Sequence, residues 1–270
     1  MRESVALTAA RNRAAIMEEL RRLMPGAQEL RTALPLGVAA IDSFLPHGGL
    51  ACGALHEIVP DGERAIAAAF GFIAALLARL PQRQGLVFVM PGYGQRHHGR
   101  LSGHGLRTLG LDPSRVILVE TAHRTQTLWA MEEALRSGAP AAVAGFIDKL
   151  DLKLSQRLHL AATDCGLPLL LIRPAPPTLP SPACGGGWGG GSAAATRWRV
   201  GTAEAARDRF GLFSRPRWHL HLERARNGRP GEWVVEYDHV AHRFSLAAAL
   251  ADPADAGVAS QKAGRQTHCA

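Results

Sequence analysis

Short apolar runs alternate with longer segments of helical periodicity through the middle of this chain, and that alternation limits the fold more than any other feature. The first run, Ala54–Val59, also contains His56 and Glu57. The other four are apolar on both faces, as in strands covered on both sides: Gly85–Met90, Val116–Val119, Ala141–Ile147 and Leu167–Ile172. Parallel strands need a crossover such as a helix between them. We therefore expect an α/β protein with a mostly parallel sheet sandwiched by helices.

The segments between the runs carry apolar residues at spacings of three and four, which predicts helices with one buried face. These apolar residues are Ile66, Phe70, Ile73, Leu77 and Leu80 within 64–80, then Leu128, Met131 and Leu135, then Leu154 and Leu158. A shorter apolar helix is predicted around Val38–Phe44. The Gly-, His- and Arg-rich stretch Gly92–Gly105 is predicted to be a loop.

The C-terminal part follows a different pattern. Arg217–Glu223 and Glu232–Asp238 alternate apolar and polar residues on either side of a turn at Gly228–Gly231. Such alternation predicts an antiparallel hairpin with one buried face and one solvent-exposed face. Arg197–Val200 and Phe244–Leu246 are expected to add further strands.

These patterns divide the chain into an arm (1–31), a core (32–173), a Pro- and Gly-rich loop (174–196), a C-terminal β extension (197–250) and a disordered tail (251–270). In the arm, residues 9–24 predict a helix that ends at Pro25-Gly26, with Ile16, Leu20 and Leu23 on one face. That face fits a solvated amphipathic helix, which we favour, or a docking arm for a partner.

Composition excludes several classes of protein. The 270 residues are 47% hydrophobic, no apolar stretch is long enough to span a bilayer, and no signal peptide opens the chain. The net charge of +8 comes almost entirely from arginine and gives only weak evidence for an acidic partner. The four scattered cysteines (Cys52, Cys165, Cys184 and Cys269) suggest reduced thiols. We expect a cytoplasmic protein.

The turn after the first inner run is where a nucleotide-binding sheet would hold phosphate. A phosphate loop needs glycine-rich backbone donors, a lysine and a serine or threonine. Here the turn reads PDGERAIA (60–67), in which proline has no N–H and Asp61 and Glu63 repel phosphate. Ile66 and Ala67 stand at the lysine and hydroxyl positions, so we expect no tight nucleotide binding.

Two parts of the sequence resemble known families. Thr32–Val59, with Gly37, Ile41-Asp42, Gly48-Gly49-Leu50, Gly53 and His56-Glu57-Ile58, is similar to the segment before the phosphate loop of RecA-family recombinases. Arg197–Val200 and Arg217–Tyr237 resemble the ImuA family, a bacterial RecA-like family associated with damage-inducible mutagenesis. The resemblance extends over roughly residues 30 to 250 and implies a RecA-like fold with a degenerate phosphate loop.

When the RecA pattern is matched to this sequence residue by residue, the catalytic groups of that pattern are absent here. Pro91-Gly92 follows the second strand where the resemblance places a water-activating glutamate, and Gly145 stands at the magnesium-binding aspartate. Arg173-Pro174 replaces the γ-phosphate sensor, and Asp148 is expected to cap a helix. Phosphoryl transfer depends on positioned charge and metal. The resemblance therefore implies a scaffold without ATPase activity, catalytic residue, cofactor or metal ion.

Other candidate sites are weaker. His219 and His221 share one strand face and with His239 or His242 could bind a metal, although an exposed strand face is the commoner arrangement. His97-His98 and His104 lie in the predicted loop and are expected to be solvated or to face a partner. Trp188 could stack on a base, but the stretch 174–195 around it contains no lysine or arginine, so a flexible surface loop is favoured.

The ImuA resemblance implies an accessory factor of SOS-inducible translesion synthesis. Its implied partners are an ImuB-like Y-family protein, RecA and an error-prone DnaE-type polymerase, with DNA contact weak or indirect. We predict that the hairpin binds a partner, because Arg and Trp are enriched at interface hot spots. The predicted contact residues are Trp218, Arg224, Arg226, Arg229, Trp233 and Arg243, although a buried core position is the stronger expectation for Trp218.

Two further functions stay open at this point. The first is a RecA-type ATPase that uses Arg64 in place of the lysine. The second is a cell-division inhibitor resembling SulA on a RecA-related scaffold.

Overall fold

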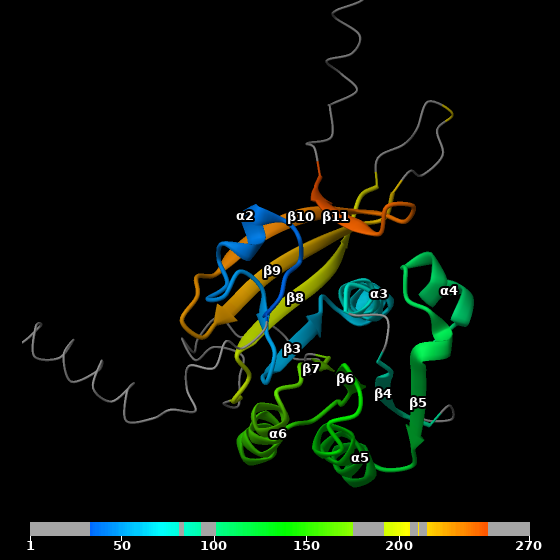
Figure 1. Ribbon diagram of the computed structural model, residues 1–270. Coiled ribbons are helices and arrows are strands. Elements are labelled where there is room, and N and C mark those ends of the chain that lie inside the picture. Colours follow the sequence, from blue (N-terminus) through cyan, green and yellow to red (C-terminus); the bar gives the residue numbers. More distant parts are fainter. Residues whose placement is uncertain are drawn as a thin grey trace, which may run out of the picture.

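The fold is organised by one mixed sheet, seen in a computed structural model that describes residues 33–80, 84–92, 101–174, 192–205, 210 and 215–247 (Figure 1). The parallel strands are β3 (Leu55–Pro60), β4 (Leu86–Pro91), β5 (Val116–Thr121), β6 (Ala142–Phe146), β7 (Leu169–Ile172) and β8 (Thr196–Ala203). Three antiparallel strands follow: β9 (Arg217–Ala225), β10 (Gly231–Asp238) and β11 (Arg243–Leu246). The order across the sheet is β11-β10-β9-β8-β3-β7-β6-β4-β5. The predicted fold class is confirmed.

Helices cover both faces of the parallel part. The helices α3 (Ile66–Leu77) and α4 (Gly103–Thr108) lie on one side, and α5 (Arg124–Arg136) and α6 (Leu152–Cys165) on the other (Figure 1). Short 3-10 helices at Glu63–Ala65 and Pro113–Arg115 precede α3 and β5. The first described residues form β1 (Ala33–Leu34), α2 (Ala39–Asp42) and β2 (Leu50–Ala51), of which β1 and β2 pair as a separate two-stranded sheet.

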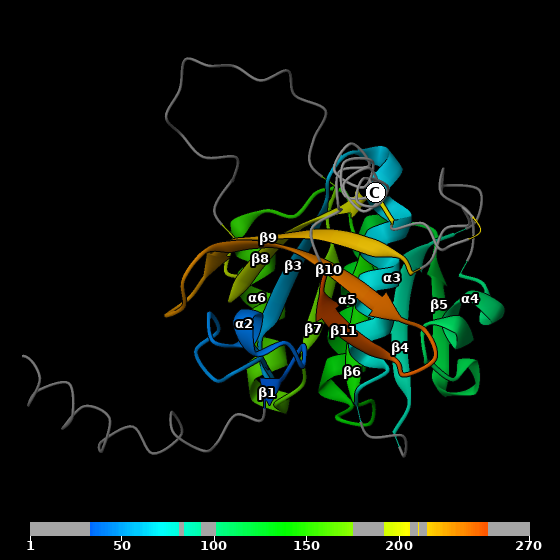
Figure 2. The same ribbon diagram turned by 90° about the horizontal axis from the view of Figure 1, so that it is seen from above.

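The antiparallel strands curl over α3, so that this helix is enclosed by sheet on two sides (Figure 2). Phe72 of α3 packs against Trp198 of β8 and Phe244 of β11, with ring centroids 6.2 Å and 5.9 Å apart. Tyr237 of β10 donates a hydrogen bond to the carbonyl of Leu109, and burial raises the pKa of its hydroxyl to about 12. The predicted C-terminal extension therefore shares the sheet and the apolar core of the parallel part.

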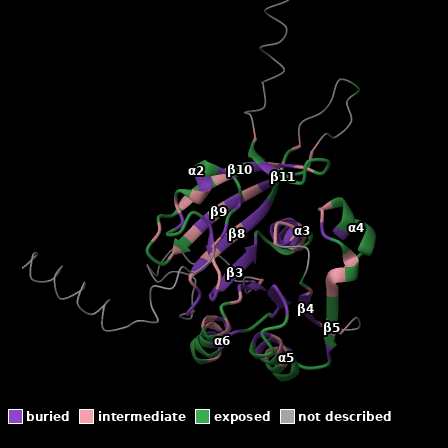
Figure 3. Ribbon diagram, in the orientation of Figure 1, coloured by how far each residue is buried: buried purple, intermediate pink, exposed green. Residues whose placement is uncertain are grey.

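A second apolar layer fills the space under α5 and α6. Met131, Leu135 and Leu158 of these helices are buried against Val89 and Val143 of the sheet. These three helix positions are among those that the spacing of apolar residues predicted. Figure 3 shows the result: the central strands and α3 are buried, while the outer faces of α5 and α6 are exposed.

One strand differs from the expectation that both of its faces are covered. β5 lies at the edge of the sheet, where Ile117 is 60% exposed and Leu118 is also exposed. Its apolar sequence does not reveal this position, because the pattern of a run carries no information about which strands pair with it.

The predicted boundaries also change in places. The helix expected over 64–80 is a 3-10 turn followed by α3, which ends at Leu77. The predicted loop 92–105 ends in a helix, since α4 begins at Gly103 with Ser102 as its N-cap. Residues 9–24, 93–100, 175–191 and 248–270 lie outside the described residues, and with them Trp188, His97-His98, Cys184 and Cys269. In the part of the chain that the structure describes, no helix has both the length and the apolar character of a membrane span.

Candidate functional site

The turn between β3 and α3 is the place where a parallel sheet of this topology would hold a phosphate group. Three of its backbone donors are engaged within the protein: Asp61 donates to the carbonyl of Val200 at 2.8 Å, Gly62 to that of Pro60 at 2.9 Å and Ala65 to that of Gly62 at 3.2 Å. Gly62 has a φ of +85°, which only glycine adopts readily and which makes this tight turn possible. These three N–H groups are therefore not available to converge on an anion outside the turn, as an anion site requires.

The side chains of the turn agree with this geometry. Ile66 is buried in the core at the first position of α3, where the phosphate-binding lysine of a nucleotide site would stand. Asp61 and Glu63 are exposed and place two negative charges at the turn. Arg64 is exposed beside Glu63 on the same 3-10 helix.

A buried carboxylate occupies the centre of the sheet next to this turn. Glu57 of β3 is fully buried, and Arg173 and Arg197 approach its two oxygens at 3.1 Å and 3.3 Å. Ser192 donates a third hydrogen bond to the carboxylate at 2.6 Å. A buried charge is tolerated only when it is paired and hydrogen-bonded in this way.

The ion pairs continue from Glu57 to the turn itself. Arg197 also binds Glu223 of β9 at 3.0 Å, and Glu223 in turn binds Arg199 of β8 at 2.5 Å. Arg199 reaches Asp61 at 3.8 Å. Three arginines and three carboxylates thus alternate from the end of β7 to the turn, and we call this set the ion network. Its cations neutralise protein carboxylates and are not free to bind phosphate.

No pattern in the sequence predicted the ion network. Arg173 was identified only as a departure from the RecA pattern, and Glu57 only as part of a strand that resembles RecA-family recombinases. The one available signal was a carboxylate within an otherwise apolar strand, at Glu57. Charged residues at such positions are almost never buried without a partner.

The position of the magnesium-binding aspartate is filled by a neighbouring helix. Gly145 of β6 is buried, and a Cβ atom built on it would overlap the terminal methyl group of Met131 on α5. The same Cβ would lie 3.2 Å from the carbonyl oxygen of Val89. A carboxylate does not fit at this position without moving Met131.

Asp148 does not have the predicted role of a helix cap. It is exposed, and its carboxylate accepts a hydrogen bond from the N–H of Lys149. The N-cap of α6 is Asp151, whose carboxylate accepts from the N–H of Leu154 at 2.8 Å. An aspartate at an N-cap satisfies one of the free donors of the first turn, which accounts for the start of α6.

The predicted hairpin contacts do not form a single patch. Trp218 is only 5% exposed and packs against Tyr237 and Phe244. It is therefore a core residue, as the stronger expectation had it, and not a surface contact. Trp233 is partly buried and meets the ring of Phe44 edge-on at 4.9 Å.

The predicted arginines are exposed, but most of them hold neighbouring backbone or rings. Arg224 donates to the carbonyls of Ser192 and Ala194, Arg226 donates to that of Ala193, and the guanidinium of Arg229 lies 4.7 Å from the Phe44 ring centroid. Arg243 is exposed at the opposite end of β10, in register with Asp238. Partner binding by these residues stays a prediction.

The histidines on the strand face have partners of their own. His219 lies 2.6 Å from Glu232 of β10, and His242 contacts Tyr237 at 3.3 Å. His221 is half-buried beside them, and His104 is exposed on α4. Nowhere in the described ranges do three histidine, cysteine or acidic side chains gather as a metal site would require.

A chain of hydrogen bonds crosses the core behind the ion network. The indole N–H of Trp198 donates to Thr196 Oγ1, which lies 2.8 Å from His56 Nδ1, and His56 Nε2 lies 2.9 Å from the carbonyl of Ala51. Because a carbonyl only accepts, Nε2 carries the hydrogen and Nδ1 accepts from the hydroxyl. Burial lowers the pKa of His56 to about 4, so the imidazole is neutral in the folded protein.

This buried imidazole predicts a loss of stability in mild acid. Since His56 takes up a proton near pH 6.5 when unfolded but only near pH 4 when folded, its contribution to stability is present above pH 6.5 and is lost as the pH falls from 6.5 to 4. We expect the free energy of unfolding to fall by roughly 2 kcal/mol from this group between about pH 7 and pH 5. Urea unfolding of wild type and His56→Gln across this range measures it. If the free energy of unfolding changed with pH equally in the two proteins, His56 would not be the cause of the loss.

Comparison with known proteins yields relatives over nearly the whole chain. No model of a known protein family matches it. The chain is 33% identical over 254 residues to Protein ImuA of Caulobacter vibrioides strain NA1000 / CB15N, which covers 89% of this chain and 98% of that protein. Protein ImuA of strain ATCC 19089 / CIP 103742 / CB 15 gives the same values.

Among solved structures, the RadB recombinase is similar to this chain. It has a TM-score of 0.53 and covers 80% of this chain and 100% of its own. At 16% sequence identity, this likeness concerns the fold. The arrangement of sheet and helices is therefore RecA-like.

Proposed function

The chain belongs to the ImuA family, and we propose that it is a non-enzymatic accessory factor of error-prone translesion DNA synthesis after DNA damage. The observation that carries the non-enzymatic part is the ion network, which uses the cations next to the β3–α3 turn to neutralise protein carboxylates. Met131 fills the space of the missing magnesium ligand and supports the same proposal. A protein of this fold without a nucleotide site can still act by binding other proteins at its surface.

We propose that these surfaces bind an ImuB-like Y-family protein, RecA and an error-prone DnaE-type polymerase. The partners follow from the family resemblance. The RecA-like fold supports a contact with RecA in particular, since a chain of this fold can offer a RecA subunit a surface like its own. In this way the protein would cap or modulate a RecA filament.

The edge strand β5 is the part of the fold best suited to such a contact. As far as the described residues extend, the sheet ends at β5, which is paired on one side only, with β4. Ile117 and Leu118 are exposed on it. An exposed apolar edge strand is a template for pairing with a strand of another chain, and natural proteins normally protect such edges.

A single substitution tests the proposed contact. We expect Ile117→Asp to weaken binding of RecA by about tenfold or more, since it places a charge in an apolar strand-pairing surface. Val240→Asp is the matched control, because Val240 is also an exposed apolar residue but lies in the β10–β11 turn. Co-purification of the full chain and both variants with RecA and with an ImuB-like protein measures the effect. Equal binding by the two variants would contradict the role of β5.

A further inference from the structure

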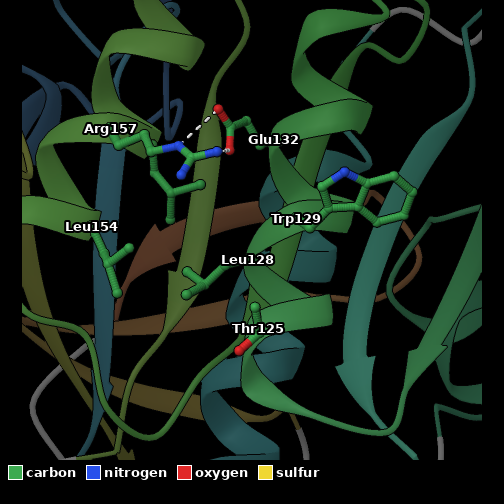
Figure 4. Close-up of a pocket in the computed structure, with 7 residues that line it drawn as sticks. Thr125, Leu128, Trp129, Glu132, Leu154 and Arg157 are labelled. Atoms are coloured by element: carbon green, nitrogen blue, oxygen red, sulfur yellow. Dashed lines mark hydrogen bonds and ion pairs between the residues drawn. The ribbon is translucent and has the colours of Figure 1, made fainter.

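The outer surface of α5 and α6 is apolar over part of its area. A groove of about 190 Å³ between the two helices is lined by Leu128 and Trp129 of α5 and by Leu154 and Leu158 of α6 (Figure 4). Trp129 at this groove is 62% exposed. Apolar side chains gathered on one face in this way mark a binding surface, whereas single exposed ones do not.

Charged groups border this groove. Glu132 is nearly buried at its wall, and its carboxylate binds Arg157 of α6 (Figure 4). The same carboxylate also binds Arg136 of α5. Arg157 nevertheless remains largely exposed, and Lys153 is exposed one turn before it. The groove therefore has an apolar floor and a basic rim, which suits a helix with an apolar stripe flanked by a carboxylate.

The N-terminal segment 9–24 of this chain has that pattern. Ile16, Leu20 and Leu23 follow the i, i+4, i+7 spacing of residues that anchor a helix in a groove. Glu19 borders the stripe they form, where it can face the basic rim. The function proposed above makes no use of this segment.

The point at which the segment joins the described body places it near the groove. Ala33 of β1 pairs with Ala51 of β2, and the following Gly53 packs against Gly166 at the end of α6. Thr163 of α6 also donates to the carbonyl of Gly53 at 2.9 Å. The linker 25–32 can span up to roughly 27 Å when extended, and α6 is about 21 Å long. The segment can therefore reach the groove of its own molecule.

We propose that residues 9–24 fold as a helix in the α5–α6 groove of the same molecule, with Ile16, Leu20 and Leu23 against Trp129 and the groove leucines. A short tether gives the segment an effective concentration in the millimolar range, so even a modest affinity keeps it docked. The exposure of this surface then depends on the N-terminal arm. This inference does not depend on the proposed function.

Amide hydrogen exchange of the full chain tests the docking from the side of the segment. We expect Leu20→Glu to raise exchange severalfold in 124–136 and 152–165, because it puts a charge in the apolar stripe. Ala14→Glu is the matched control: it adds the same charge on the opposite side of the segment and should leave exchange at the wild-type level. Leu20→Glu exchanging like wild type, or both variants exchanging alike, would overturn the proposal.

The reciprocal variant keeps the test independent of one substitution. Because Trp129 is exposed, Trp129→Glu should leave the melting temperature unchanged while exchange in 9–24 rises. Unchanged exchange in 9–24 would overturn docking. Protection that grows with protein concentration would overturn it in favour of docking onto a second copy. Since neither RecA nor ImuB is present, failure here leaves the proposed function untouched.

Discussion

In the Glu57→Ala variant we expect the free energy of unfolding to fall by about 3–5 kcal/mol. The substitution removes the carboxylate that Arg173 and Arg197 share and leaves two nearly buried guanidinium groups without their common partner. It also removes the acceptor of the Ser192 hydroxyl. Chemical denaturation followed by circular dichroism measures the change.

The loss of stability in Glu57→Ala should come from the burial of the Glu57 carboxylate and not simply from the removal of an acidic residue. Glu232→Ala is the matched control, since Glu232 is an exposed carboxylate in the same sheet and pairs, among the described residues, with His219. We expect it to change the free energy of unfolding by no more than about 0.5 kcal/mol. Similar small losses in both variants would mean that the ion network does not hold the centre of the sheet together.

Restoring the missing aspartate should be worse than removing Glu57. We expect Gly145→Asp to cost more than about 4 kcal/mol, or to prevent folding, because it both overpacks the core and buries a carboxylate without a partner. The new side chain would collide with Met131 and approach the carbonyl oxygen of Val89. Soluble yield and melting temperature measure the result.

A double variant separates the collision from the buried charge. Met131→Ala makes room beside Gly145, so Gly145→Asp should be less costly in that background than in wild type. Gly145→Asp with a wild-type melting temperature would show instead that the position is open. The glycine at position 145 would then not mean that the space for a magnesium-binding aspartate is filled.

Much of the architecture could be predicted from local patterns. The inner strands and the buried faces of α3, α5 and α6 follow from periodicity, because a core requires apolar residues on the faces that meet it. The hairpin of β9 and β10 follows from alternation around a turn. The edge position of β5 did not follow, since strand order depends on contacts between distant segments.

The candidate site was predictable only as a set of absences. Ile66 and Gly145 could be matched to the RecA pattern, but what fills the space beside them could not. Glu57 meets Arg173 and Arg197 across 116 and 140 residues, a distance over which spacing along the chain is uninformative. In the same way, Arg224 and Arg226 gave no local sign that they hold the backbone before β8.

We propose that protein side chains occupy the nucleotide position of this RecA-like fold. Thermal unfolding of the full chain with and without magnesium and ATP tests this most directly, because a ligand present at a hundred times its dissociation constant stabilises the native state by about 2.7 kcal/mol. We predict no nucleotide-dependent change in melting temperature for the wild type. A saturable rise at micromolar ATP that Arg64→Ala abolishes would contradict the account.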